Sequence, residues 1–280
     1  MKPARSWLFV PADSEKKIAK AISGDADALI FDLEDSVAPA NKEAARKIIG
    51  NLDPRKEGGP QWWVRINPIG TEEHKKDLQL IARFDVSGIV LPKAESGADV
   101  THLAHSTGNI PIHAIVTETP ASLFGLLSYR DVASPLAAMS WGAEDLSAAL
   151  GASSKRGADG DLAFTYKMAR SLCLAGAVAA GAQPVDGVFT DIGDEAGLIA
   201  EARAAAAEGF TGKLAIHPAQ VGPINEAFTP TDEQVTEAQA IVDAFKAEPD
   251  AGVLKIGGKM VDLPHLKQAQ ALLERAHGLT

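Results

Sequence analysis

Acidic residues follow short apolar segments at several points of the chain, and two of them are suited to holding a metal ion. Glu118 follows the segment 112–117, and Asp145 follows the segment 136–141. If these segments are neighbouring parallel strands, both carboxylates lie at the same edge of one sheet. Mg²⁺ takes one or two carboxylates as ligands and leaves its other positions to water and substrate. The pair therefore predicts a magnesium site that can hold a small keto or hydroxy acid.

Each of these two acids also has a simpler interpretation as the N-cap of a helix. Side chains that accept backbone hydrogen bonds are common at the first residue of a helix, so a single acid after a strand is more often a cap than a ligand. The placement of Glu118 and Asp145 after neighbouring segments favours the metal site over two unrelated caps.

Arg65 lies near the end of a third apolar segment, within the sequence WWVRIN. A partly buried arginine requires a carboxylate, which its planar guanidinium binds through two hydrogen bonds. That carboxylate could belong to the substrate, or to a structural acid such as Glu34 or Asp35, and both contacts can exist together. We favour substrate contact, including contact with an enolate oxygen that develops during the reaction.

The run Asp32-Leu33-Glu34-Asp35 follows another apolar segment. Asp32 and Glu34 point the same way if the strand continues through them. We expect Glu34 and Asp35 to orient Arg65 and metal-bound water, although Asp35 could instead cap the next segment.

Two further polar residues follow apolar segments, and each has alternative roles. Lys93 could bind a phosphate or a substrate oxygen, whereas in a class I aldolase such a lysine forms a Schiff base and needs a depressed pKa. His217 could act as a base or serve only as a hydrogen-bonded structural residue, and the sequence does not decide between them.

Eight apolar segments alternate with helix-like stretches, and these elements must position the residues described above. The segments lack polar alternation, which is typical of parallel strands buried on both faces. The predicted strands cover residues 7–11, 28–33, 62–67, 88–92, 112–117, 136–141, 187–190 and 213–216. This order predicts an α/β fold, a closed (β/α)₈ TIM barrel, better than an open sheet. No Gly-x-Gly-x-x-Gly follows the first segment, which argues against a dinucleotide-binding fold.

The pattern changes near residue 228, which predicts a catalytic barrel over residues 1–228 and a C-terminal extension over 229–280. The extension is expected to contain a helix over 231–246, a small hairpin over 253–261 that turns at Gly257-Gly258, and a final helix over 264–276. It could pack on its own barrel or reach a neighbouring subunit.

Composition places the chain among globular proteins and excludes several other classes. The 280 residues are 46% hydrophobic and 23% charged, with a formal net charge of −10 and one cysteine, Cys173. An acidic chain without a basic cluster is not expected to bind nucleic acid or an anionic membrane. A single cysteine and the absence of a long apolar run favour a cytoplasmic protein.

Eight pieces of the sequence, taken in order, resemble the citrate lyase β-subunit and malyl-CoA lyase family, part of the HpcH/HpaI aldolase superfamily. They are RSWLFVPAD, DALIFDLEDSV, VRIN, VLPKAE, ETP, SWGAEDLSAALG, AIHPAQV and GKMVDLPHLKQA. They span almost the full length. Single pieces such as ETP carry little weight, but the ordered set is specific to the family.

The resemblance implies a Mg²⁺-dependent lyase that assembles as a homotrimer or a dimer of trimers. By this resemblance Glu118 and Asp145 match the metal ligands, and Arg65 matches the residue that holds the keto-acid fragment. Asp262, in GKMVDLP, matches an acid that several thioester-cleaving members deliver from a neighbouring subunit. From the residues alone, Asp262 is only a candidate N-cap for the helix that begins near Pro264.

Four functions remain open at the level of sequence. The first is a carbon–carbon lyase that cleaves a β-hydroxyacyl thioester of the malyl-CoA, citramalyl-CoA or citryl type into an acyl thioester and an α-keto acid. The second is the β subunit of a citrate lyase complex, which acts on an acyl-carrier-protein thioester. The third is a (3S)-malyl-CoA thioesterase. The fourth is a non-catalytic barrel, against which the retained acids and Arg65 argue.

Overall fold

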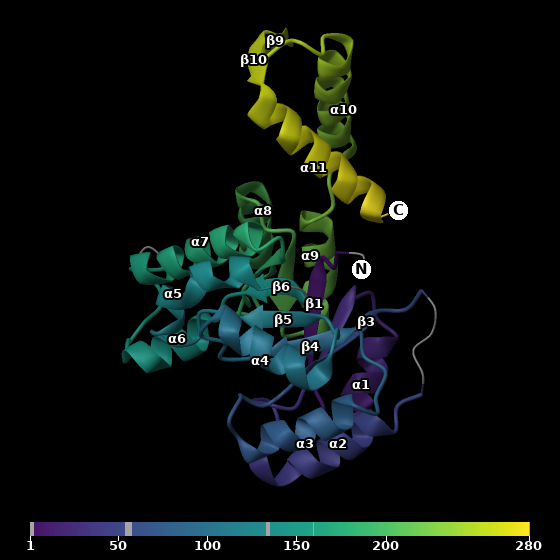
Figure 1. Cartoon of the computed structure of the whole chain (residues 1–280), viewed down its shortest axis with the longest axis vertical. Coiled ribbons are helices and arrows are strands. Elements are labelled where there is room, and N and C mark those ends of the chain that lie inside the picture. The colour runs from purple at the N-terminus through teal and green to yellow at the C-terminus, as the bar shows by residue number, and fades with distance from the viewer. Residues whose placement is uncertain (1–2, 54–57, 133–134, 159, 280) are drawn as a thin grey trace. The chain divides into compact units, whose positions relative to one another are not determined.

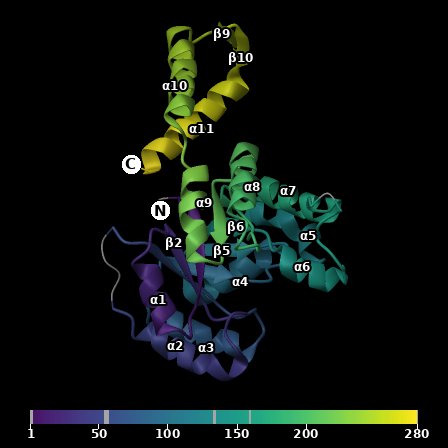
Figure 2. The same cartoon turned by 180° about the vertical axis from the view of Figure 1, so that it is seen from behind.

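Eight parallel strands close into a barrel, and helices lie around it (Figures 1 and 2). The computed structural model describes residues 3–53, 58–132, 135–158 and 160–279. Each strand pairs with the next one along the chain, and β8 pairs with β1 to close the ring. The predicted (β/α)₈ barrel is therefore confirmed.

The strands are short and are buried along most of their length. They are β1 (Ser6–Pro11), β2 (Ala28–Asp32), β3 (Gln61–Arg65), β4 (Gly88–Leu91), β5 (Ile112–Ile115), β6 (Leu136–Ser140), β7 (Gln183–Asp186) and β8 (Gly212–Ala215). Parallel pairing places the carboxyl end of each strand beside those of its neighbours, and Asp32 of β2 lies opposite Arg65 of β3.

Helices connect consecutive strands, as the alternation in the sequence predicts, although two of them lie between β6 and β7. They are α1 (Glu15–Ile22), α2 (Lys42–Gly50), α3 (Glu72–Ile81), α4 (Gly97–Thr107), α5 (Ser122–Gly125), α6 (Ala143–Leu150), α7 (Phe164–Ala179), α8 (Glu195–Glu208) and α9 (Val221–Ala227), with 3₁₀ turns at Pro39–Asn41, Leu126–Asp131 and Pro218–Gln220. Helix α1 shows how the local sequence determines these elements. Ser14 caps its first turn, and Ile18 and Ala21 form its buried face.

One strand prediction is wrong. The segment 187–190 was expected to form the seventh strand, but β7 covers Gln183–Asp186 and the predicted segment forms the following loop. The true strand contains Pro184 and ends at Asp186, so it lacks the apolar pattern on which the prediction depends. Asp186 is nevertheless fully buried, because Lys213 and Arg170 pair with its carboxylate at 2.7 and 2.8 Å.

The barrel interior is filled by apolar side chains from the strands. Its members include Trp7, Ile30, Trp63, Val90, Ile115, Ala138, Val185 and Leu214. Gly88 makes room for one of the two tryptophans, since a Cβ atom at this position would lie 2.2 Å from the Trp63 ring. The interior is therefore a packed and mainly apolar core.

The chain divides into two compact units, Ala4–Asn225 and a second one that contains Pro3 and residues 226–279. The second unit contains α10 (Asp232–Ala247), the antiparallel strands β9 (Val253–Ile256) and β10 (Lys259–Asp262), and α11 (Leu263–Leu279). Helices α10 and α11 pack through Ala238, Val242, Ala269 and Leu273. Positive φ angles of 55° at Gly257 and 84° at Gly258 form the expected hairpin turn.

A membrane-spanning helix is not found in the described part of the chain, where each helix is too short or too polar to cross a bilayer.

Candidate active site

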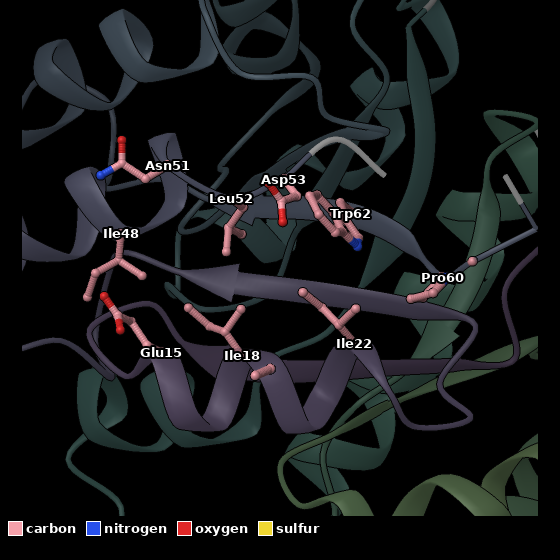
Figure 3. A pocket seen from close by; sticks show the side chains of 11 residues that line it. Glu15, Ile18, Ile22, Ile48, Asn51, Leu52, Asp53, Pro60 and Trp62 are labelled. Atoms are coloured by element: carbon pink, nitrogen blue, oxygen red, sulfur yellow. The ribbon is translucent and has the colours of Figure 1, made fainter. Parts of the chain in front are cut away.

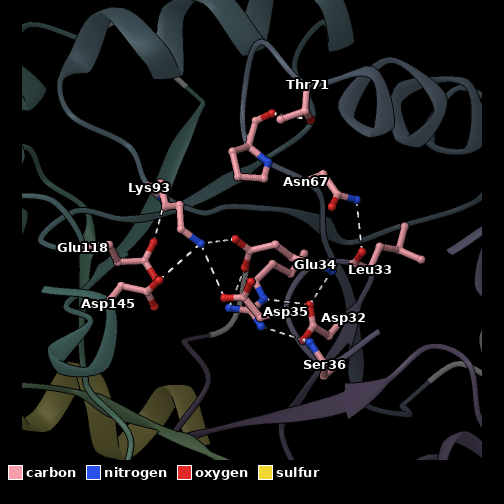
Figure 4. A network of polar contacts seen from close by, with 12 residues as sticks. Asp32, Leu33, Glu34, Asp35, Ser36, Asn67, Thr71, Lys93, Glu118 and Asp145 are labelled. Carbon is pink, nitrogen blue, oxygen red and sulfur yellow. Dashed lines mark hydrogen bonds and ion pairs between the residues drawn. The ribbon is translucent and has the colours of Figure 1, made fainter. Parts of the chain in front are cut away.

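The chemistry-bearing residues of the first unit gather at the carboxyl ends of five consecutive strands, β2 to β6 (Figure 4). Asp32 and Arg65 are the last residues of β2 and β3. Lys93 follows β4 by two positions, Glu118 follows β5 by three, and Asp145 lies in the first turn of α6. This is the face on which barrels of this kind carry their catalytic residues.

Arg65 is held by two acids and one aromatic ring. Its Nε and Nη2 atoms donate to the carboxylate of Asp32 at 2.7 and 2.6 Å, and its Nη1 atom lies 2.9 Å from Glu34 Oε2. The guanidinium also stacks on Phe9, with 4.7 Å to the ring centroid. Burial opposes its charge, but the Asp32 carboxylate raises the pKa of Arg65 above its usual value. Arg65 is thus a rigid cation, and a guanidinium has further N–H groups with which to bind a ligand carboxylate.

Asp32 is the principal partner of Arg65, a role for which the sequence pointed to Glu34 or Asp35. It is 1% exposed, and although burial disfavours its charge, Arg65 holds the pKa of its carboxyl below the ordinary value. The i, i+2 spacing of Asp32 and Glu34 was the available signal, because it places both side chains on one face of an extended strand.

Glu34 lies between the two cations of the site. One of its oxygens pairs with the Lys93 ammonium, and its Oε2 atom is buried beside Arg65 without the alignment of a hydrogen bond. Burial raises the pKa of Glu34 in spite of the lowering effect of both cations. Lys42, which could not be identified from the sequence, fixes this loop by donating to the carbonyls of Leu33 and Glu34 at 2.8 Å each.

Lys93 contacts most of the carboxylates of the site. Its ammonium pairs with Glu34, lies 3.4 Å from Asp35 and 3.3 Å from Asp145, and its backbone N–H donates to Glu118. Burial alone would lower the pKa of Lys93, but the hydrogen bond to Glu34 and the surrounding acids raise it instead. A lysine that stays protonated is a poor nucleophile, so the class I aldolase alternative loses its support.

Glu118 and Asp145 are not helix caps. The N-cap of α5 is Ala121 and that of α6 is Gly142. The Glu118 side chain is buried, whereas the side chain of Asp145 is 32% exposed. Burial raises the pKa of Glu118 to about 8, and the nearby charge of Asp145 adds to this effect. Figure 4 shows both carboxylates beside the Lys93 side chain, from which they can approach a common ligand.

The donor set at this position fits a hard divalent cation. Oxygen atoms of Glu118 and Asp145 are ligands that Mg²⁺ prefers. Burial, together with the charges of Asp145 and Glu34, raises the pKa of Glu118, and a bound cation would favour its ionised form. Within the described residues, no cluster of three or more His, Cys, Asp or Glu side chains is arranged to hold a metal. A cation at this site would therefore rely on two protein carboxylates, with water and substrate completing its coordination, as Mg²⁺ commonly does.

Asp262 belongs to the second compact unit, where it ends β10. Its side chain pairs with the His265 ring and accepts a long hydrogen bond of 3.5 Å from the His265 backbone N–H. These contacts lie at the start of α11 and agree with the capping interpretation, while the catalytic role of Asp262 stays a prediction. His217 has a structural contact, since its Nδ1 atom accepts the Ala219 N–H at 3.2 Å.

A separate cavity of about 520 Å³ lies next to α1 and the end of α2 (Figure 3). Its walls are mainly apolar and include Ile18, Ile22, Ile48, Leu52 and Trp62. None of the predicted site residues lines this cavity, so it is distinct from the candidate active site.

The chain is similar over nearly its full length to three named proteins. It is 40% identical over 272 residues to the citrate lyase subunit beta-like protein of Mycobacterium tuberculosis, covering 96% of this chain and 94% of that one. It is 34% identical to the mitochondrial citramalyl-CoA lyase of Rattus norvegicus, with 98% and 86% covered. It is also 34% identical to the (3S)-malyl-CoA thioesterase of Cereibacter sphaeroides, with 99% and 96% covered.

A solved structure matches the whole chain. The protein CitE of Mycobacterium tuberculosis, in complex with magnesium, acetoacetate and coenzyme A, superposes with a TM-score of 0.85 at 38% identity. The match covers 99% of this chain and 100% of that one.

Two family models match the sequence. Residues 165–279 match a carbon–carbon bond lyase of the TIM-barrel fold. Residues 5–218, which include every site residue of the first unit, match the model described as HpcH/HpaI aldolase/citrate lyase. With this match and relatives of up to 40% identity, the chain belongs to the HpcH/HpaI aldolase/citrate lyase family.

Proposed function

We propose that the chain is a Mg²⁺-dependent carbon–carbon lyase that cleaves a β-hydroxyacyl thioester into an acyl thioester and an α-keto acid. The observation that carries this proposal is the grouping of Glu118 and Asp145 with Arg65 and Lys93 on the catalytic face of the barrel. The magnesium and coenzyme A bound by the similar CitE structure support both the metal and the thioester. Malyl-CoA, citramalyl-CoA and citryl thioesters are the candidate substrates.

The metal ligands in this proposal are Glu118 and Asp145. A bound Mg²⁺ ion supplies Lewis-acid charge that stabilises negative oxygen on the substrate. Arg65 binds the substrate carboxylate, and since Asp32 and Glu34 fix its orientation, its charge needs no reorganisation during the reaction. Lys93, whose ammonium pairs with Glu34, binds a second oxygen of the substrate.

Glu34 is the proposed proton acceptor for the β-hydroxyl group, with Asp35 orienting water beside it. Its pKa is raised by burial, which brings a carboxylate closer to the range in which it can exchange protons near neutral pH. Loss of the hydroxyl proton lets the Cα–Cβ bond break, and its electron pair passes to the thioester fragment as an enolate. Arg65 provides fixed positive charge close to this reaction.

The resulting enolate must be protonated, and Asp262 is the proposed acid. By the family resemblance, Asp262 comes from the C-terminal unit of a neighbouring subunit, so we propose that the chain acts as a homotrimer or a dimer of trimers. The side chain of Asp262 pairs with the His265 ring at the start of α11, which holds it in place.

A substrate assay tests this function directly. Purified chain with Mg²⁺ is incubated with malyl-CoA and with citramalyl-CoA, and the products are separated by liquid chromatography. We expect acetyl-CoA together with glyoxylate or pyruvate, and no turnover after chelation of the metal. An enzyme that forms no α-keto acid from either substrate, or from a citryl thioester, would contradict the lyase proposal.

The similarity to a (3S)-malyl-CoA thioesterase supports thioester hydrolysis as a second candidate function, because the same site could also hydrolyse the thioester. The same assay separates the two activities, since a thioesterase releases free CoA and malate. Repeating it with the substrate on an acyl-carrier protein tests the third possibility, a subunit of a citrate lyase complex.

A further inference from the structure

The Lys93 ammonium lies against the same carboxylates that are proposed to bind the cation. It is 3.3 Å from Asp145 Oδ1, and it pairs with Glu34, whose side chain is 3% exposed. The Lys93 side chain itself is 29% exposed, so its charge is only partly screened by water. A positive charge is therefore built into the immediate surroundings of the proposed metal ligands.

The backbone of Lys93 adopts a conformation that is rare for its residue type. With a φ angle of 52°, it is the one non-glycine residue with positive φ within the part of the chain that the structure describes. This conformation directs the backbone N–H of Lys93 to Glu118 while its side chain reaches Asp145. A strained backbone conformation of this kind persists only where surrounding contacts hold it. Such conformations are concentrated at functional sites.

We propose that Lys93 sets the affinity of the site for its divalent cation, because its ammonium competes with the cation for the carboxylate of Asp145. The inference rests on the proposed function, in which Glu118 and Asp145 are the ligands. Two cations that share one carboxylate repel each other, and each lowers the affinity of the other. Removing the ammonium must then strengthen cation binding, which is the opposite of what loss of a supporting residue would do.

The chain offers a closely matched control. Lys155 pairs with Glu144, the residue directly before Asp145, and its side chain is 25% exposed, similar to that of Lys93. No described contact joins Lys155 to Glu118 or Asp145. Substitution of Lys155 therefore removes one positive charge from the same region without changing the proposed ligands.

The experiment is a calorimetric titration of Mn²⁺ into the wild-type chain, Lys93→Met, Lys93→Arg and Lys155→Met. We expect Lys93→Met to bind Mn²⁺ at least about tenfold more tightly than wild type, because a repelling charge has been removed. Lys93→Arg keeps the charge and should bind close to the wild-type affinity, as should Lys155→Met. If Lys93→Met does not fold, Lys93→Gly serves the same purpose, since glycine accepts the positive φ angle and keeps the N–H.

The outcomes separate this inference from the function on which it rests. Equal or weaker Mn²⁺ binding by the folded variant that lacks the ammonium would overturn the role of Lys93. Equal strengthening in Lys155→Met would also overturn it, because the effect would then come from net charge alone. Absence of Mn²⁺ binding at millimolar concentration in both the wild-type chain and Lys93→Met would instead overturn the metal site itself.

Discussion

At the scale of single residues, the position of Glu118 depends on its neighbours as much as on its own side chain. The backbone of Lys93 donates to one oxygen of Glu118, and Gly142 leaves space for its methylene groups. A Cβ atom at position 142 would lie 2.6 Å from Glu118 Cγ, much closer than atoms in contact can lie. Gly142 is therefore a positioning residue for the proposed metal ligand.

The variant Gly142→Ala should weaken cation binding by at least about tenfold, because the new methyl group displaces Glu118. Overpacking of this kind costs about 1–3 kcal/mol of stability, so the chain should still fold. Mn²⁺ calorimetry and urea unfolding measure the two effects. Gly222→Ala is the control, since no atom lies within 4 Å of a Cβ at that position. Unchanged binding in Gly142→Ala would show that Glu118 does not need this space.

The fork of hydrogen bonds made by Arg65 predicts that lysine cannot replace it. Arg65→Lys keeps the charge but loses the paired contacts with Asp32, so we expect kcat/KM to fall by about 100-fold or more. Steady-state kinetics measure this loss. Arg5→Lys is a suitable comparison, because Arg5 forms a similar fork with Asp27 just before β1 and should leave kcat/KM within about twofold. Equal kinetics for Arg65→Lys and wild type would remove Arg65 from the proposed mechanism.

The sequence predicted which residues meet at the rim, but it did not predict their pairings. Carboxyl ends of consecutive parallel strands share one face, so Arg65, Glu118 and Asp145 could be expected together from the order of the segments. Partner choice depends on side-chain reach and local backbone conformation. For this reason, Asp32 as the main partner of Arg65 and Lys42 as the support of the Glu34 loop were both missed.

At the scale of elements, apolar pattern located seven of the eight barrel strands but not β7. That strand ends at Asp186, whose buried carboxylate pairs with Lys213 of β8. A pattern based on hydrophobicity cannot distinguish a short strand with a charged residue from a loop. The ends of the other strands differ from the predicted ones by at most two residues. These differences do not change which side chains reach the rim.

Strand β5 places His113 in the barrel interior, where it is fully buried against Trp7 and its Nε2 atom lies 2.9 Å from Ser140 Oγ. Burial lowers the pKa of His113 to about 3, so the folded chain holds it neutral. In the unfolded chain the pKa is about 6.5. The unfolded state thus binds the extra proton first, and stability is full above about pH 6.5 and falls as the pH decreases towards about 3.

The variant His113→Gln should therefore reduce the pH dependence of stability. When the pH decreases from 7 to 5, protonation of this histidine in the unfolded chain lowers the free energy of unfolding of the wild type by about 2 kcal/mol. The variant lacks this histidine and should not show that decrease. Urea unfolding at the two pH values measures this difference. His102 on α4 is exposed, so His102→Gln should retain the wild-type pH dependence. A wild-type pH dependence in His113→Gln would contradict the claim that burial lowers the pKa of His113 in the folded chain.

At the scale of the whole molecule, the proposed mechanism draws on both compact units. Glu118 belongs to the unit Ala4–Asn225, whereas Asp262 belongs to the second unit, which has an apolar core of its own. From the residues alone, the segment 229–280 could be described only as an extension, since its hairpin and helices carry no constellation of catalytic residues. The proposal that it serves a neighbouring subunit depends on the family resemblance and requires its own test.

Subunit mixing provides that test. Glu118→Gln and Asp262→Ala should each be inactive, the first without its metal ligand and the second with turnover reduced by about 10²–10⁴ as for loss of a general acid. When the two variants are unfolded and refolded together, mixed oligomers contain some sites with both native residues, and we expect part of the activity to return. Mixing without recovery, in oligomers shown to be mixed by mass spectrometry, would place Asp262 in its own subunit or outside the mechanism.

The most direct test of the central claim is the position of a bound cation. A crystal of the chain soaked with Mn²⁺, which scatters anomalously, should show one strong peak between Glu118 and Asp145, at about 2.1–2.2 Å from an oxygen of each carboxylate. We predict that this peak is absent in crystals of Asp145→Asn soaked in the same way. A peak that contacts only one of the two acids, or one that lies at another site, would contradict the shared metal on which the proposed reaction depends.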